Sequence, residues 1–294
     1  MNEPSFQPTI PLSLPPFGQS MTFRLSPGRN PKLALERLSL GFDHTEGVIG
    51  IGAPFARAFP GTIPGLRTFP SLSGVNCTVP ATQKDLWVFL RGNDRGEIFD
   101  RSRILRSFLE KDFALEDAMD TFFYHGRDLS GYEDGTENPK GDEIAKVAFV
   151  PPGNPLAGSS FVAVQRWIHD LKWFQTHPRH EQDNIIGRKQ KTNEELDQAP
   201  DSAHVKRTAQ ESFNPPAFML RRSMPWATVD EQGMEFIVYG HSLDPFERVL
   251  RRMVGEEDGI PDALFSFSRP VTGGYYWCPP VKNGKIDLTA LGFA

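Results

Sequence analysis

The chain has 294 residues, enough for two domains or for one large domain with a well-buried core. Its 32 basic and 37 acidic side chains give a net charge of −5, which excludes the strongly basic surface that binds a nucleic-acid backbone. No stretch of roughly 18 or more consecutive apolar residues occurs, so we expect no membrane span. The 23 phenylalanines, against 5 tyrosines and 5 tryptophans, indicate a large apolar core or a pocket for a flat apolar ligand.

The segment before Met21 is rich in proline and has no basic start, no long apolar run and no twin arginine. We therefore expect no export signal and a cytoplasmic protein. The two cysteines, Cys77 and Cys278, lie far apart and outside any CxxC motif. This spacing favours two buried free thiols over a metal site or a redox site.

The first half of the chain predicts a strand, a helix, two strands, a helix and a strand. The expected strands cover residues 21–25, 48–52, 86–90 and 113–124. Asn30 followed by Pro31 predicts the start of the first helix. The second helix places apolar or small residues on one face at spacings of three and four, namely Ile98, Phe99, Ser102, Leu105, Phe108 and Leu109. Residues 53–82, with many prolines and glycines, predict a long irregular loop.

The second half predicts the same order of elements more clearly. The expected strands cover residues 161–167, 218–222, 235–239 and 275–277, and helical segments run through Phe174 and over 180–188. Asp244 and Pro245 predict the cap and the first residue of another helix, which ends near Gly255.

This repeated order is that of a ferredoxin-like unit, in which helices cover one face of an antiparallel sheet. We therefore predict an α+β protein with two ferredoxin-like domains, of the dimeric α+β barrel type. The predicted domains are residues 1–130 and 131–294, because glycines and polar residues interrupt the pattern at 126–135.

The most unusual string is Gly-Tyr-Glu-Asp-Gly-Thr-Glu-Asn-Pro at residues 131–139. Glycines on both sides of Asp134 can bring the backbone close to a ligand and hold the carboxylate in one direction. Taken alone, an ordinary Asp-Gly turn at a domain boundary explains the string better.

Two later strings also contain residues capable of chemistry. Residues 202–207 contain His204 and Arg207, and Arg221, Arg222 and Ser223 follow. Taken alone, a single histidine is more often a core or surface residue than a ligand, and paired arginines on a strand are more often solvated. Another set of histidines, His169, His177 and His180, suggests zinc. No cysteine lies near them, so surface positions are the better interpretation for His177 and His180.

Taken together, these strings resemble the dye-decolorising peroxidases, a family of haem proteins. The Gly-x-x-Asp-Gly signature at 131–135, continued by Thr-Glu-Asn-Pro, has the form found in bacterial members. The resemblance extends over nearly the whole chain through the strings at 82–86, 164–171, 186–188, 265–268 and 272–274. The spacing matches the compact bacterial subgroup. The resemblance implies a haem b peroxidase that reduces hydrogen peroxide and oxidises dyes or other one-electron donors through a ferryl intermediate.

The same resemblance assigns His204 as the axial ligand of the haem iron, with Asp134 and Arg221 as the distal pair. An imidazole is a suitable axial donor, and its electron release favours cleavage of the O–O bond. A carboxylate can take a proton from peroxide and return it, and a guanidinium stabilises the negative charge that develops. Because an unperturbed aspartate titrates near pH 3.9, we expect activity to persist into acid. By the same resemblance, Asp262 is the candidate for the carboxylate that bonds His204 and orients it. Its position is also that of a helix cap.

Three more residues are candidates for contacts with the cofactor. Arg188 and Arg207 match the carboxylates of haem propionates, although an ordinary surface salt bridge explains Arg207 equally well. Ser223 stands two residues after Arg221, where its hydroxyl can bond a distal water or a propionate. Arg222 is expected to face the other way, since side chains alternate along a strand.

Two other functions remain open at this point. A haem-handling protein, which binds or stores haem or releases its iron, would share His204 and have only incidental peroxidase activity. A haem-free structural or sensor domain is the third interpretation. The expected partners are hydrogen peroxide and an unnamed reducing substrate, with no nucleic acid and no membrane, and we expect a homo-oligomer.

Overall fold

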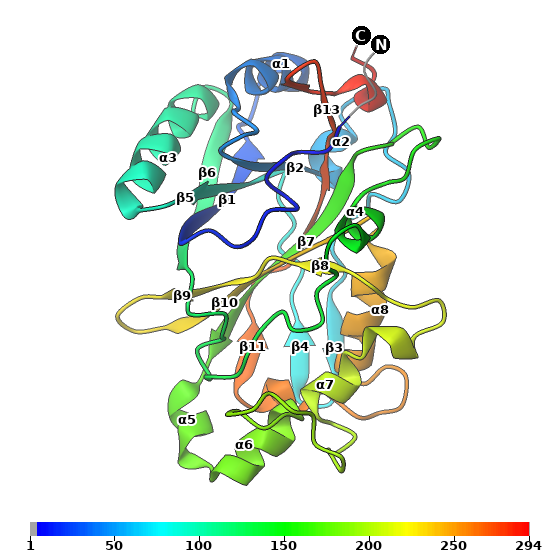
Figure 1. Cartoon of the computed structure of the whole chain (residues 1–294). Coiled ribbons are helices and arrows are strands. Elements are labelled where there is room, and N and C mark those ends of the chain that lie inside the picture. The colour runs from blue at the N-terminus through cyan, green and yellow to red at the C-terminus, as the bar shows by residue number, and fades with distance from the viewer. Residues whose placement is uncertain (1–4, 294) are drawn as a thin grey trace.

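The first half of the chain forms four antiparallel strands with two helices packed on one face. In this computed structural model, which describes residues 5–293, the elements are β1 (Phe17–Leu25), α1 (Pro31–Gly41), β2 (Gly47–Gly52), β5 (Leu86–Gly92), α3 (Arg95–Leu109) and β6 (Phe113–Phe122). The strand order is β6-β1-β5-β2. Helix α1 begins as predicted, with the side chain of Asn30 accepting from the Lys32 amide and with Pro31 in the first turn. The two helices lie side by side against the sheet (Figure 1).

The second half repeats this arrangement. Its sheet consists of β7 (Ser160–His169), β8 (Leu220–Arg221), β9 (Met224–Ala227), β10 (Gln232–Gly240), β11 (Ser268–Pro270) and β12 (Gly274–Cys278). The order is β12-β7-β10-β8, with β9 also on β10 and β11 also on β7. In each half the four main strands therefore lie side by side in the same order across the sheet: the last strand of the half, then its first, third and second. This order confirms the predicted ferredoxin-like α+β fold. Pairing of β2 with β12, at Ile51 and Trp277, joins the halves into one sheet.

The remaining helices and short strands lie outside this sheet. The helices are α2 (Ala53–Ala56), α4 (Glu143–Ala148), α5 (Leu171–Thr176), α6 (Arg179–Ile186), α7 (His204–Arg207) and α8 (Asp244–Met253). The strands β3 (Leu72–Gly74) and β4 (Cys77–Val79) form one hairpin, and β13 (Val281–Lys282) and β14 (Lys285–Ile286) form another. Among the described residues, no helix has both the length and the apolar character needed to cross a membrane.

The sheet curls so that β6 lies beside β9, and its inner face holds an aromatic and charged core. Trp87, Tyr239 and Tyr276 are fully buried there, with the Trp87 and Tyr276 ring centroids 6.1 Å apart. Arg166 donates to Glu235 at 3.1 Å and to both carboxylate oxygens of Asp117. Burial raises the pKa of the Glu235 carboxyl, and the charge of Arg166 opposes this rise. Because each of these charges has a partner of opposite sign, its burial costs less than burial of an isolated charge.

Several predicted elements need correction. Residues 53–82 are not a uniform loop, because they contain α2 and the β3–β4 hairpin, which turns through Asn76 at a positive φ of 60°. Strand 218–222 is shorter than predicted. The Ser223 hydroxyl accepts from the Ile237 amide and so interrupts the backbone ladder between β8 and β9. Asp244 is the first residue of α8 rather than its cap, since Leu243 occupies the cap position.

The face of α3 was predicted too broadly. Its buried residues are Ile98, Ser102, Leu105 and Leu109. Phe99 and Phe108, which flank this stripe, are 65% and 47% exposed. By contrast, Cys77 and Cys278 are free and buried, as predicted.

Candidate active site

A cavity lies between the outer face of the second half's strands and α8. The empty space between its walls is about 990 Å³ when the part open to solvent is included. Gln165, Trp167 and His169 reach it from β7, because alternate side chains of a strand point to the same face. The opposite wall is the apolar stripe of α8, which consists of Phe246, Val249, Leu250 and Met253. Such a space suits a flat apolar ligand.

His204 lies on the wall of this cavity, at the start of α7. Its Nδ1 is 2.8 Å from Oδ2 of Asp262, a carboxylate that is only 2% exposed. The other Asp262 oxygen accepts from the Leu264 amide at 2.8 Å, so this residue both orients the histidine and caps the following turn. Within the described part of the chain, no protein group bonds Nε2 of His204. A carboxylate on Nδ1 fixes the tautomer in which Nε2 is free to ligate a metal.

Asp134 and Arg221 line the same cavity. Gly131 and Gly135 on either side of this loop segment have φ values of 88° and 74°, which glycine adopts at little cost. The Asp134 amide donates to the Gly126 carbonyl at 3.1 Å, and its own carboxylate accepts from the Gly135 amide at 2.7 Å. These two hydrogen bonds restrain the backbone and the carboxylate of Asp134.

Asn138, at the end of the same string, holds Arg221. Its Oδ1 accepts from the Arg221 amide at 2.7 Å, and its Nδ2 donates to the Arg221 carbonyl at 3.1 Å. The asparagine thus pairs with β8 as a neighbouring strand would and ties the distal arginine to the loop of Asp134. Sequence reasoning missed this role, although Asn138 stands within the string that it singled out.

Several buried polar atoms around the cavity have no hydrogen-bond partner among residues 5–293. They are Nε of Arg221, Nε1 of Trp167 and both amide atoms of Gln165. Buried polar atoms are normally bonded, so the orphaned ones indicate that a bound group belongs here. A cavity with apolar walls, one available imidazole nitrogen and these polar atoms fits a haem.

The other predicted cofactor residues do not line this cavity. Arg188 donates to Glu137 at 2.8 Å and to Glu195 at 2.5 Å. Arg207 is buried and forms a two-bond pair with Asp258 at 2.7 and 2.8 Å. Ser223 is also buried, and its hydroxyl is bonded by the Ile237 amide.

A second group of polar residues lies at the cavity, and the sequence analysis considered His169 only as a zinc candidate and did not connect it with Asp128 and Ser268. The buried ring of His169 is 2.7 Å from the Ser268 hydroxyl through Nδ1 and 3.0 Å from Asp128 through Nε2. Burial alone would raise the pKa of Asp128, but the charge and hydrogen bond of His169, together with Ser130, lower it to about 2. Only the fold brings these residues together. Within the described chain, no set of three or more His, Cys, Asp or Glu side chains could hold a metal ion.

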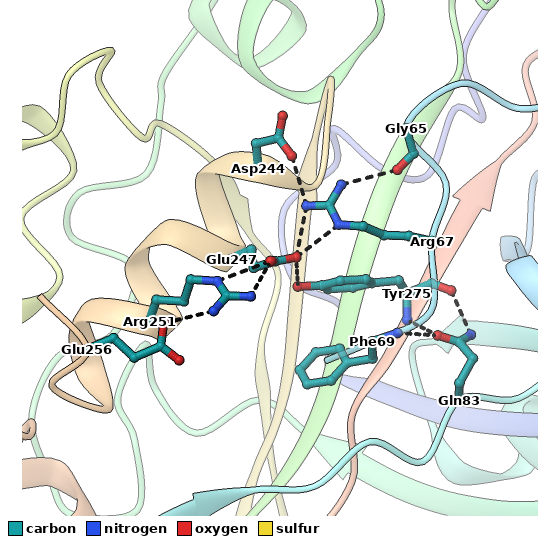
Figure 2. A network of polar contacts seen from close by, with 9 residues as sticks. All are labelled: Gly65, Arg67, Phe69, Gln83, Asp244, Glu247, Arg251, Glu256 and Tyr275. Atoms are coloured by element: carbon teal, nitrogen blue, oxygen red, sulfur yellow. Dashed lines mark hydrogen bonds and ion pairs between the residues drawn. The ribbon is translucent and has the colours of Figure 1, made fainter. Parts of the chain in front are cut away.

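Helix α8 is fastened to the sheet by a polar network behind the cavity (Figure 2). Arg67 donates to Asp244 at 2.8 Å and to Glu247 at 2.9 Å. The Tyr275 hydroxyl donates to the same Glu247 carboxylate at 3.4 Å, while Gln83 bonds both the amide and the carbonyl of Tyr275. Burial and the nearby Glu247 raise the pKa of the Tyr275 phenol, which keeps its proton available for donation. The network fixes the helix wall that faces the cavity.

Comparisons with known proteins agree with this geometry. Residues 125–283 match the family model described as "Dyp-type peroxidase, C-terminal". A dye-decolorizing peroxidase of Mycobacterium tuberculosis is 32% identical over 248 residues, which cover 81% of this chain and 74% of that protein.

Solved structures are similar over nearly the whole fold. A putative Dyp-type peroxidase from Shewanella oneidensis superimposes with a TM-score of 0.89 at 28% identity and covers 100% of both chains. A variant of DypB from Rhodococcus jostii, solved in complex with heme, superimposes with a TM-score of 0.82 at 27% identity, covering 91% of this chain and 94% of that one.

Proposed function

Because the chain belongs to the dye-decolorizing peroxidase family and is a haem-dependent peroxidase, we propose that His204 ligates its haem and that Asp134 and Arg221 activate the peroxide. The observation that carries this assignment is the meeting of all three residues at one cavity, with His204 held by Asp262. These residues come from three separate segments of the chain.

When bound, haem supplies the redox-active iron at which the O–O bond of peroxide is cleaved. As that bond breaks, Asp134 would act as the general base and acid, taking the proton from one peroxide oxygen and delivering it to the other, which leaves as water. The guanidinium of Arg221 stabilises the negative charge that develops on the leaving oxygen. Asn138 keeps Arg221 in register with the loop of Asp134. Asp262 holds the proton on Nδ1 of His204 and makes Nε2 a stronger donor.

The direct test is substitution of the distal pair. We expect Asp134→Ala and Arg221→Ala to slow the reaction with hydrogen peroxide by about 10²–10⁴-fold and about 10²–10³-fold, respectively. Stopped-flow absorbance measures the rate, and the haem absorption band confirms that each variant still binds haem. Asp142→Asn, an exposed aspartate beyond the same string, is the matched control. Full reactivity in both distal variants would contradict the assignment of Asp134 and Arg221 to peroxide activation.

Arg188 remains our proposed propionate partner, since its present acceptors Glu137 and Glu195 are exposed carboxylates that a propionate can replace. Arg207 is a weaker proposal, because its guanidinium already has Asp258 as a two-bond partner. We propose that the Ser223 hydroxyl bonds a distal water or a propionate.

The two arginines can be distinguished by measuring the haem affinity of Arg188→Met and of Arg207→Met. We expect the larger loss of affinity for Arg188→Met.

We also propose the division into domains at 1–130 and 131–294, whose outermost residues, 1–4 and 294, lie outside the described part. The repeated strand order and the family match over 125–283 support it. A cytoplasmic location and self-association remain predictions. Exposed apolar side chains on α1 and α3, namely Leu40, Phe99 and Phe108, support self-association. Light scattering of the purified protein tests it, and a monomeric mass would contradict it.

A further inference from the structure

Half of the methionines that the structure describes line the cavity. The chain has seven methionines, of which Met1 lies outside the described residues. The cavity walls include three of the other six, which are 5%, 8% and 7% exposed, respectively: Met219, Met234 and Met253. Methionine fills irregular apolar gaps, but its thioether is also oxidised to a sulfoxide. Oxidisable sulfur therefore surrounds the space in which this peroxidase activates its oxidant.

Met219 is the cavity methionine nearest in the chain to the distal pair. It precedes Arg221 by two residues, so their Cα atoms are at most about 7 Å apart. The Met219 amide donates to Oε1 of Gln210 at 2.9 Å, and the Gln210 side chain donates to the Glu137 carbonyl at 3.5 Å. Glu137 belongs to the same string as the distal aspartate. Met219 is thus held beside the distal pair, whereas Met253 belongs to the opposite wall, on α8.

The methionines away from the cavity provide a scale of accessibility. Met119 on β6 is half-buried and is the most exposed of the six described methionines. Met21 and Met224 are fully buried. Oxidation by dissolved peroxide without catalysis follows exposure, so it would affect Met119 first. Peroxide activated at the cavity would oxidise the cavity methionines first, and the two sources of oxidation therefore predict opposite orders.

An unsatisfied hydrogen-bond donor lies on the same wall as Met219. Nε of Arg221 is buried and has no hydrogen-bond partner within the described chain. A thioether sulfur is only a weak acceptor, whereas the oxygen of a sulfoxide is polar and accepts readily. An Arg221 side chain that donates to such an oxygen is held away from peroxide, where its charge is needed.

From this placement we infer that excess hydrogen peroxide, activated at the cavity, oxidises Met219 to the sulfoxide and that this modification slows the enzyme. One peroxide oxygen bonds to Sδ of Met219 as the O–O bond breaks, and the other leaves as water with both hydrogens. The sulfur loses two electrons and the peroxide gains two. A reducing substrate consumes the same oxidising power, so Met219 is oxidised when that substrate is scarce. The inference rests on the proposed roles of Asp134 and Arg221.

The first test is peptide mass spectrometry of the parent protein after treatment with hydrogen peroxide and no reducing substrate. Bound haem covers the cavity walls, so simple access of peroxide predicts less oxidation of Met219 in the haem-loaded protein than in the haem-free protein. We expect the reverse, with Met219 gaining oxygen at least about tenfold faster in the loaded protein and before Met253 and Met119. A loaded protein in which Met219 is oxidised no faster than Met119 would overturn the inference.

The second test removes the sulfur and keeps the size of the side chain. Met219→Leu should keep its own starting rate over at least about threefold more peroxide turnovers than the parent, and Met119→Leu is the matched control that should behave like the parent. Methionine sulfoxide reductase with dithiothreitol should restore the rate of the oxidised parent. An oxidised parent that carries the sulfoxide at Met219 and keeps its full rate would overturn the slowing effect.

The outcomes separate this inference from the assignment of the distal pair. If Asp134→Ala is slow with peroxide while Met219 of the loaded parent stays unoxidised, the proposed function stands and the inference is wrong. If Met219 is oxidised selectively in the parent and equally fast in a fully reactive Asp134→Ala, the modification stands and the proposed base is wrong. Mass spectrometry of the parent decides the modification even when Met219→Leu fails to fold.

Discussion

The two halves of the molecule share one strand order but use the outer face of the sheet differently (Figure 1). In the first half, α1 and α3 press buried side chains such as Leu35 and Leu105 directly against the strands. In the second half, α8 faces β7 and β10 across the cavity that His204 lines. One arrangement of strands thus supports a filled core in one half and a cavity in the other.

The difference arises in the connection after the first strand of each half. In the first half, α1 follows β1 and covers the sheet with an 11-residue helix. In the second half, the connection between β7 and β8 forms only the short helices α5, α6 and α7. It leaves part of the sheet without a covering helix and carries His204 to the cavity wall. The cavity thus lies in the half whose first connection contains only short helices.

The largest expected difference between the two halves is in how a buried leucine contributes to stability with and without haem. Leu35→Ala in α1 should lower the free energy of unfolding by about 2–5 kcal/mol, equally in the haem-free and haem-loaded protein. Leu250→Ala in α8 should destabilise the loaded protein more than the haem-free one, since Leu250 lines the cavity. Denaturant unfolding of both forms measures this. Equal effects of the two substitutions on haem affinity would show that the halves do not differ as described.

A smaller effect is expected from the support of the proposed ligand. Asp262→Asn keeps the cap on the Leu264 amide but removes the charge that faces His204. Haem affinity should fall by about 10–100-fold, and the reduction potential of the bound iron should rise because the imidazole becomes a weaker donor. Asp258→Asn, which removes the partner of Arg207, is the control. An unchanged potential in Asp262→Asn would contradict the role of Asp262.

The smallest effect concerns Asp128 at the cavity rim. Its pKa of about 2 lies below the ordinary value of 3.8, so its ionised form stabilises the folded state. This contribution, on the order of 2 kcal/mol, is complete above about pH 4 and is lost as the pH falls towards 2. Unfolding of the parent and of Asp128→Asn across this range should show a gap in stability that closes in acid. A gap that stays constant from pH 6 to pH 2 would show that the carboxylate contributes nothing through its charge.

Much of the fold could be predicted from local patterns. The apolar runs of β5 and β7 and the cap at Asn30 depend on neighbours in sequence, and the structure confirms them. The split between β8 and β9 depends on a side-chain bond from Ser223 to a distant strand, which no local pattern records. The β3–β4 hairpin is too short to show a period. Whether Phe99 is buried or exposed depends on which side of α3 packs against the sheet, and spacing along the helix does not fix this.

The same distinction applies to the site. His204, Asp134 and Arg221 were predicted because they stand in strings that resemble a known family, and the structure brings them to one cavity. The contacts of Asp128 with His169, and of Asn138 with Arg221, join segments that are distant in sequence. Such contacts depend on the register of the folded chain and could not be read from residue types.

The central claim is that the cavity of the second half holds haem through Nε2 of His204. The most direct measurement is titration of haemin into the purified protein and into His204→Gly, followed by absorption and electron paramagnetic resonance spectra with and without added imidazole. The account predicts a histidine-ligated spectrum for the parent, its loss in His204→Gly and its return when imidazole fills the vacated space. Identical spectra for the parent and His204→Gly without imidazole would contradict it.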